Sequence, residues 1–364
     1  MHILARIDFS AIVQNFYRAQ ELAGDSVVIP VIKANAYGHG AIQVAQALNG
    51  AALFAVARMS EAQQLRDAGV QQPLLILSET WHAESFQLAS EQNYVPVIHD
   101  EHSISLLDQV ALSSPIDVWL KIDTGMHRLG IYSDGAYDQI NRLKRIDCVR
   151  SVCLMTHFAT ADASSCDFLD AQYQVFQDIQ RDHPSLSSSM ANSAALLRSQ
   201  TYHADFVRPG IMLYGADPLF KLGSDAQLAC TMQLTAPVLS VRRIHKGESA
   251  GYNRSWYAGR DSLIATVGIG YADGYPRHAK NGTPVAINGK IYPLVGTVSM
   301  DMICVDVTDA PLEADIKVGA RAELWGKQVN VNDVALSGDT IAYELFTSLG
   351  RRVTYVDLDS VSSP

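Results

Sequence analysis

The sequence predicts an α/β protein with an N-terminal (β/α)8 barrel, of the TIM type, followed by a mostly β C-terminal domain. Two observations predict the barrel. Strand-like apolar runs alternate with helix-like runs over roughly 200 residues, and the strand-like runs number eight. A third observation separates the second domain: beyond about residue 222, short strands and Gly and Asn turns replace the alternation.

The barrel elements follow one another in a regular order. The strand candidates are residues 27–32, 53–57, 73–77, 94–98, 116–122, 149–155, 186–190 and 204–207. The helix candidates between them are residues 41–48, 60–68, 81–90, 100–112, 134–144, 164–182 and 193–199. A doubly wound open sheet gives a similar alternation. The strand count favours the barrel, and no G-x-G-x-x-G turn follows the first strand.

The C-terminal part of the chain is rich in short strands. Strands are predicted at residues 231–241, 262–267, 284–287, 302–307 and 322–325, with one helix at 339–349. Asn281-Gly282 and Asn288-Gly289 suit hairpin turns. Ile3–Ile7 precedes the barrel and is expected to pair with this domain. The expected division is 1–10 for an N-terminal strand joining the C-terminal domain, 11–225 for the barrel and 226–364 for the β domain.

Composition excludes several classes of function. The net charge of −10 and pI near 5.5, without a Lys/Arg-rich run, argue against a nucleic-acid partner. No stretch approaches the roughly 20 apolar residues that span a bilayer, and the N-terminus lacks an export signal, so no membrane association and a cytoplasmic location are expected. The five cysteines are scattered and suggest neither disulfides nor a metal site.

Polar and ionisable side chains that could take part in catalysis follow the predicted barrel strands. The barrel rule places catalytic groups at the C-terminal ends of several strands. The residues at these positions are Lys33, Lys121, His157, Asn192, Ser193 and Arg208. Each side chain alone could have a structural role with its hydrogen bonds made within the fold, and a lysine at a strand end could keep its ammonium group in water. Their common position favours an active site.

A phosphate site is expected at the loops after strands seven and eight. Ser193, the backbone of Gly210 and Ile211, and the Tyr37 hydroxyl are candidate donors. With Lys33 nearby, one ligand is pyridoxal 5′-phosphate, whose aldehyde forms a Schiff base with lysine. The other is a sugar phosphate in an aldolase-type site. The residues alone leave both ligands open.

One stretch carries a family resemblance. VIKANAYGHG at 31–40 resembles the pyridoxal-phosphate attachment signature of alanine racemases. The similarity continues in KIDTGMHRLG (121–130), MTHFA (155–159), NSAA (192–195), RPGIMLYG (208–215), GY (251–252), GYADGY (270–275) and VSMDM (298–302). The resemblance implies an isomerase that interconverts L- and D-alanine and supplies D-alanine for peptidoglycan.

The resemblance also implies a role for each catalytic residue. Lys33 would hold the cofactor as an aldimine and, once freed, act as base on one face of the substrate Cα, with Tyr252 on the opposite face. A phenol is a poor base at neutral pH, and His157 would assist Tyr252 and contact Arg208 in turn. Arg208 would face the pyridine nitrogen, to which a guanidinium can donate a hydrogen bond without readily transferring a proton.

Substrate and cofactor contacts follow from the same resemblance. Arg128 and the Met300 backbone would bind the substrate carboxylate, Tyr271 would narrow the entrance, and Lys121 would be carbamylated beside Arg128. The expected cofactor contacts are Lys33, Tyr37, His157, Asn192, Ser193, Arg208, Gly210, Ile211 and Tyr343.

A second subunit is part of the expectation. Tyr252, Met300 and Asp301 would come from the partner of a head-to-tail homodimer with shared active sites. Two kinds of alternative remain open: a broader amino-acid racemase or decarboxylase of the same fold, and a non-catalytic cofactor-binding barrel protein. Proteins of the second kind generally lack the β domain that carries Tyr252.

Overall fold

Eight parallel strands form the barrel of the computed structural model, which describes residues 2–311 and 315–358. They are β2 (Val27–Val28), β3 (Phe54–Val56), β4 (Leu74–Ile76), β5 (Tyr94–Ile98), β6 (Ile116–Asp123), β8 (Val149–Met155), β9 (Ser188–Ser189) and β10 (Phe206–Val207). The sheet order is β2-β10-β9-β8-β6-β5-β4-β3, and the short β7 (Ile131–Tyr132) pairs with β6. The predicted barrel is confirmed.

The barrel closes between β3 and the chain that continues β2. Val31 forms a parallel bridge with Ala55; the Ile32 N–H donates to Ala55 O (2.8 Å) and the Ala55 N–H to Pro30 O (2.9 Å). The regular strand β2 ends at Val28, short of the predicted end at residue 32. Pro30 has no N–H to give to a ladder, and it interrupts the regular pairing there.

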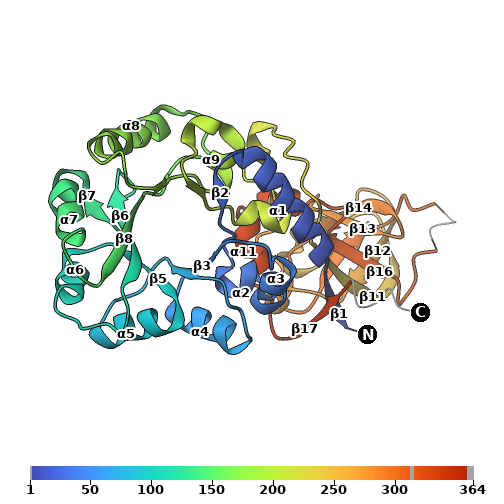
Figure 1. Cartoon of the computed structure of the whole chain (residues 1–364). Helices are drawn as coiled ribbons and strands as arrows, with labels where there is room; N and C mark the ends of the chain where they lie inside the picture. The colour runs from blue at the N-terminus through green and yellow to red at the C-terminus, as the bar shows by residue number, and fades with distance from the viewer. Residues whose placement is uncertain (1, 312–314, 359–364) are drawn as a thin grey trace.

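Helices surround the barrel (Figure 1). They are α1 (Phe9–Ala23), α3 (Ala41–Ala47), α4 (Met59–Asp67), α5 (Ala83–Gln92), α6 (Glu101–Leu107), α7 (Ala136–Leu143), α8 (Asp167–Asp182) and α9 (Ser193–Arg198), with 3-10 turns η1 (Ser133–Gly135), η2 (Gln200–Tyr202), η3 (Ile211–Tyr214) and η4 (Phe220–Leu222). The sequence analysis missed α1. This helix is amphipathic, with one buried face. The Asp8 side chain caps its N-terminus by accepting from the Ala11 N–H (2.8 Å).

The second domain is built on a ring of six antiparallel strands. They are β11 (Met232–Ile244), β12 (Ser262–Val267), β13 (Pro284–Ile287), β14 (Lys290–Val295), β15 (Ile303–Asp306) and β16 (Arg321–Trp325), with β11 pairing both β12 and β16. The domain also contains η5 (Tyr252–Arg254), η6 (Tyr271–Asp273), α10 (Val331–Ser337) and α11 (Ala342–Thr347). The sequence analysis missed α10, β14 and the final strand, β17 (Val353–Asp357).

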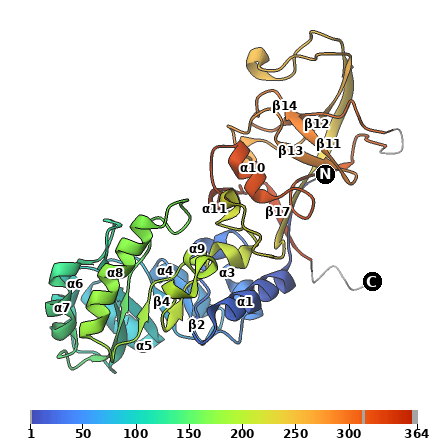
Figure 2. The ribbon, with the colours of Figure 1, turned by 90° about the horizontal axis from the view of Figure 1, so that it is seen from above.

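The first strand of the chain lies in this second domain. β1 (Ile3–Ile7) pairs antiparallel with β11 and parallel with β17, and Figure 1 shows it beside β17. Figure 2 shows the barrel and the β domain as two lobes joined near α1 and α11. At this junction the buried Asn15 accepts from the Ala229 N–H (2.8 Å) and donates to the carbonyls of Ala229 (2.9 Å) and Leu213 (3.2 Å).

Of the two expected hairpin turns, only one is present. Asn288 and Gly289 both have positive φ, 48° and 83°, and join β13 to β14 in the manner of a type I′ turn. The Asn281-Gly282 prediction was wrong. These residues lead into β13 from a loop, where the Asn281 side chain accepts from the Gly296 N–H (2.7 Å) and so ties the loop to the end of β14. No helix in the described ranges is long and apolar enough to cross a membrane.

Candidate active site

A cavity of about 510 Å³ opens at the C-terminal ends of the barrel strands. It brings together eleven of the residues expected from the sequence, from the strand ends, from the loops that follow them and from α11. They are Lys33, Tyr37, Lys121, Arg128, His157, Asn192, Ser193, Arg208, Gly210, Ile211 and Tyr343. The cavity wall also includes Ser78, Glu344 and Thr347, to which the sequence analysis gave no chemical role.

Lys33 begins α2 (Lys33–Tyr37), which is a single left-handed turn. Ala34, Asn35, Ala36 and Tyr37 all have φ of 52° or 53°. The turn keeps helical hydrogen bonds, from the Ala36 N–H to Ile32 O (2.9 Å) and from Gly38 to Ala34 (3.0 Å). Left-handed backbone costs roughly 1–2 kcal/mol for each L-residue, so neighbouring contacts must hold this conformation.

Polar contacts fix the turn from three sides. The Glu61 carboxylate accepts from the Ala34 N–H (Oε1, 2.6 Å), and the Asn35 side chain accepts from the Ala41 N–H (2.9 Å) at the start of α3. The buried His39 ring contacts Tyr37 O through Nδ1 (3.0 Å) and Thr231 Oγ1 through Nε2 (3.0 Å). The sequence analysis did not identify Glu61, because it lies on a different helix and nothing in its spacing points to Lys33.

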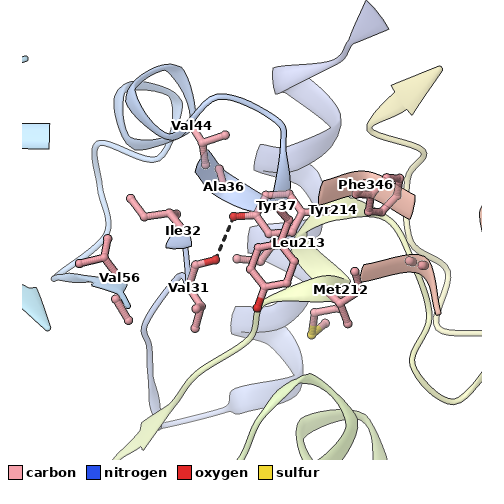
Figure 3. Packing of buried hydrophobic residues seen from close by; sticks show 14 of the residues in the cluster. Val31, Ile32, Ala36, Tyr37, Val44, Val56, Met212, Leu213, Tyr214 and Phe346 are labelled. Carbon is pink, nitrogen blue, oxygen red and sulfur yellow. Dashed lines mark hydrogen bonds between the residues drawn. The ribbon is translucent and has the colours of Figure 1, made fainter. Parts of the chain in front are cut away.

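Aromatic packing holds the C-terminal end of the turn. Tyr37 stacks on Tyr214 with ring centroids 4.8 Å apart and lies 5.9 Å from Tyr343. Figure 3 shows Tyr37 packed against Tyr214, with the Tyr214 hydroxyl donating to Val31 O (2.9 Å). A methyl group on Gly210 would lie 2.4 Å from the Tyr37 hydroxyl oxygen. Only glycine leaves space for that hydroxyl at the cavity wall.

Four cationic side chains give the cavity a positive potential. Burial, followed by Arg128, lowers the pKa of Lys33, and Arg208 acts in the same direction. Burial, followed by Arg208, Arg128 and Lys33, lowers the pKa of the buried Lys121 to about 8. Such a grouping favours anionic ligands and makes both amines easier to deprotonate than ordinary lysines.

Arg208 is anchored to the strand ends. Its guanidinium donates to the hydroxyl of Ser189, to Thr156 O (2.7 Å) and to Met190 O (3.3 Å). Burial lowers its pKa to about 10, which leaves it protonated at neutral pH. Burial and then Arg208 lower the pKa of His157 well below its ordinary value, which favours the neutral imidazole. Within the described residues no hydrogen bond joins His157 to Arg208.

The loops after β9 and β10 form the other end of the cavity. The Ser193 hydroxyl oxygen accepts from the backbone N–H of Gly210 (2.8 Å) and, more weakly, of Met212 (3.4 Å). Its own proton is therefore free to donate to a ligand. Asn192 caps α9 by accepting from the Ala195 N–H (3.0 Å), which orients the helix start toward the same loop.

A tight loop after β6 carries Arg128. The Asp123 carboxylate accepts from the backbone N–H groups of Gly125 (2.9 Å) and His127 (3.0 Å). Gly130 has φ 135°, and a Cβ there would lie 2.6 Å from Asp123 N. The carboxylate and this glycine fold the loop back so that Arg128 reaches the cavity.

Four expected site residues lie on the β domain, outside this cavity. Tyr252, Tyr271 and Met300 are 65%, 41% and 52% exposed, and the Asp301 side chain is 52% exposed. The Tyr271 N–H donates to Ser299 O (3.1 Å), which joins two of the loops that carry these residues. Asp301 pairs with Arg352 (2.7 Å). Within one chain these residues do not line the cavity with Lys33.

Family models match both parts of the chain. Residues 7–218 match the model described as alanine racemase, N-terminal domain, and residues 231–356 match alanine racemase, C-terminal domain. The alanine racemase of Pseudoalteromonas atlantica is 44% identical over an alignment of 366 positions, which covers 96% of this chain and 97% of the relative. The biosynthetic alanine racemase of Escherichia coli is 40% identical over 356 residues, with coverage of 96% and 98%.

Solved structures show the same similarity. The crystal structure of biosynthetic alanine racemase from Pseudomonas aeruginosa has a TM-score of 0.91 and 38% identity, covering 98% of this chain and 99% of that chain. The structure of alanine racemase from Bartonella henselae with covalently bound pyridoxal phosphate has a TM-score of 0.85 and 32% identity, covering 98% and 100%.

Proposed function

The chain belongs to the alanine racemase family and is an isomerase that interconverts L- and D-alanine, and we propose that it does so with Lys33 and Tyr252 as two bases. The observation that carries this proposal is the cavity in which Lys33 lies among Lys121, Arg128 and Arg208. We further propose that the D-alanine serves peptidoglycan synthesis. The free, scattered cysteines of the described residues suit the reducing cytoplasm that we propose as the location.

The residues present fit pyridoxal phosphate. The Ser193 proton, the Tyr37 and Tyr343 hydroxyls and the Ile211 N–H would hold its phosphate, and Lys33 would attach its aldehyde carbon. The Gly210 N–H donates to Ser193 Oγ (2.8 Å), so Gly210 would support this end of the site by orienting the Ser193 hydroxyl. The space that Gly210 leaves beside the Tyr37 hydroxyl supports this assignment. When bound, the cofactor withdraws electrons from the substrate and makes its Cα–H bond acidic.

Arg208, His157 and Asn192 line the cavity and would contact the cofactor, and Arg208 and His157 would tune the chemistry of the site. Arg208 would donate a hydrogen bond to the pyridine nitrogen and leave the proton on the guanidinium, since strand-end carbonyls hold its cation in place. His157, kept neutral by burial and then by Arg208, can accept a hydrogen bond from the phenol of Tyr252 and orient it.

Arg128 would bind the substrate carboxylate, and Lys121 would help to orient it. An unmodified lysine repels a neighbouring guanidinium, and the lowered pKa of Lys121, about 8, gives it a larger fraction of the neutral amine, the form that carbon dioxide carbamylates, than an ordinary lysine has. The resulting carbamate is an anion and would attract Arg128. We therefore propose a carbamylated Lys121.

Inversion at Cα needs a proton donor and acceptor on opposite faces, and Lys33 can serve only one face. Tyr252 would serve the other from a partner subunit, together with the Met300 backbone and Asp301, while Tyr271 would narrow the entrance. The exposure of Tyr252 and Met300 on the β domain supports a head-to-tail homodimer. We also propose that the chain divides into an N-terminal strand (1–10), a cofactor-binding barrel (11–225) and a β domain (226–364).

The test of the two bases is proton exchange at Cα of L- and D-alanine in deuterated water. Lys33→Ala should lose covalent attachment of pyridoxal phosphate, measured by mass after borohydride reduction, and Tyr252→Phe should keep it. Tyr252→Phe should lose exchange in one direction more than in the other. Racemisation by Tyr252→Phe at the wild-type rate would show that the tyrosine is not a base. Faster turnover of serine than of alanine would contradict the substrate assignment.

Mixing the two variants tests the shared site. Each variant alone should be inactive in racemisation. After subunit exchange at equal amounts, half of the dimers are mixed, and each mixed dimer contains one intact site, so about one quarter of wild-type activity should return. If no activity returns although mixed dimers form, the site is not shared between subunits.

A further inference from the structure

The Glu61 carboxylate connects two helical elements of opposite hand. Glu61 is the third residue of α4, and its Oε2 accepts from the N–H groups of Ala57 (2.7 Å) and Arg58 (3.0 Å) at the start of that helix. This is ordinary capping by a carboxylate. Its Oε1 instead accepts from the Ala34 N–H (2.6 Å), in the left-handed turn that follows Lys33.

Backbone acceptors do not replace this contact. A helical hydrogen bond from Ala34 would go to Pro30 O, but that carbonyl accepts from the Ala55 N–H (2.9 Å) where the barrel closes. The Ala34 N–H would otherwise depend on water. A charged acceptor at 2.6 Å is among the stronger kinds of protein hydrogen bond, and it acts on the residue directly after Lys33.

We propose that Glu61 is a positioning residue that holds the left-handed turn and thereby directs the Lys33 side chain into the cavity. Glu61 does not line the cavity, so it acts through the turn rather than on a ligand. The inference rests on the proposed role of Lys33 as the attachment lysine.

The charge of Glu61 gives the proposal a second readout. Arg128, Arg208 and Lys121 surround Lys33, and Glu61 is the carboxylate that raises the pKa of Lys33 against burial and the guanidinium groups. Removing the negative charge should move the titration of Lys33 to lower pH. If Glu61 only stabilised the fold, its replacement would leave the pH at which Lys33 titrates unchanged.

The test compares Glu61→Gln with Glu79→Gln in the full-length chain. Glu79 provides a matched control, because its carboxylate accepts from the Met59 N–H (2.9 Å) at the start of the same helix, whereas among the described residues the Ala34 N–H donates to Glu61. Both proteins are stripped of cofactor and titrated with pyridoxal phosphate. Absorbance gives the dissociation constant and the attachment rate at each pH.

Glu61→Gln should bind pyridoxal phosphate about tenfold or more weakly. The single carbonyl oxygen of glutamine can accept either from the Ala34 N–H or from the N–H groups at the start of α4, but not from both. The pH profile of attachment should also shift to lower pH, whereas Glu79→Gln should match the wild type within about twofold. Equal effects of the two variants on affinity and pH profile would mean that Glu61 only caps α4. A Glu61→Gln protein that behaves like the wild type would also overturn the proposal.

Lys33→Ala separates this inference from the proposed function. If that variant still forms a covalent adduct with pyridoxal phosphate, the assignment of Lys33 is wrong whatever Glu61 does. If the adduct is lost while Glu61→Gln remains unaffected, only the positioning role fails.

Discussion

Replacing Ala34 by glycine should stabilise the protein, although the same change in an ordinary helix destabilises it. Ala34 is exposed, with φ 52° and ψ 50°, so its methyl group contributes little packing. Alanine in this conformation costs roughly 1–2 kcal/mol, and glycine avoids that cost but loses roughly 0.5–1 kcal/mol in backbone entropy. The net gain is up to about 1.5 kcal/mol. The Glu61 contact is to the backbone and survives the substitution.

Ala171 is the matched control for this prediction. It is an exposed residue inside the right-handed helix α8, where glycine is about 0.8–1.0 kcal/mol worse than alanine. Urea unfolding of the cofactor-free proteins, followed by circular dichroism, should therefore give midpoints displaced in opposite directions from the wild type. Equal destabilisation by Ala34→Gly and Ala171→Gly would refute the argument that the turn stores left-handed strain.

Three further outcomes follow from the structure. Gly210→Ala places a methyl group 2.4 Å from the Tyr37 hydroxyl and should weaken pyridoxal phosphate binding by about 1–3 kcal/mol, measured by titration; unchanged affinity would contradict the close packing. Asp8→Ala should lower the free energy of unfolding, measured by urea unfolding, by about 1 kcal/mol through loss of the α1 cap; an unchanged free energy would argue against the cap. Arg150 holds the pKa of Asp117 below its ordinary value of 3.8, so this carboxylate stabilises the fold above about pH 4, and that stabilisation is lost as the pH falls through the lowered pKa. The difference in unfolding free energy between the wild type and Asp117→Asn, about 0.5–1 kcal/mol at pH 7, should therefore shrink steadily as the pH is lowered below about 4; a difference that does not change with pH would exclude the linkage.

The sequence predicted the elements whose patterns are local. The barrel strands are short apolar runs with polar residues at their ends, and the strand-end rule placed Lys33, Lys121, His157 and Arg208 at one cavity. The barrel helices were mostly found for the same reason. Predicted ends were less accurate, as in the first strand, where Pro30 interrupts the pairing.

Features decided by tertiary contacts escaped the sequence analysis. The stretch Ala34–Tyr37 contains no glycine, and residue preferences alone give no reason to expect a left-handed turn there. Glu61 and the packing of Tyr37 on Tyr214 select that conformation, and both come from distant parts of the chain. The strand β17 was also missed, since its partner β1 lies at the opposite end of the sequence.

The pairing of β1 with β11 and β17 makes the barrel an insertion within the β domain. β1 is synthesised before the barrel and its partner β17 (Val353–Asp357) after it, so the sheet that contains both strands cannot be complete until β17 has been made. During synthesis the barrel can fold before β17 has been made, whereas the β domain cannot complete its sheet until then. The two lobes therefore complete folding at different times. Both ends of the described chain are held in one sheet, and removal of Ile3–Ile7 would expose edges on two strands far from the deletion in sequence.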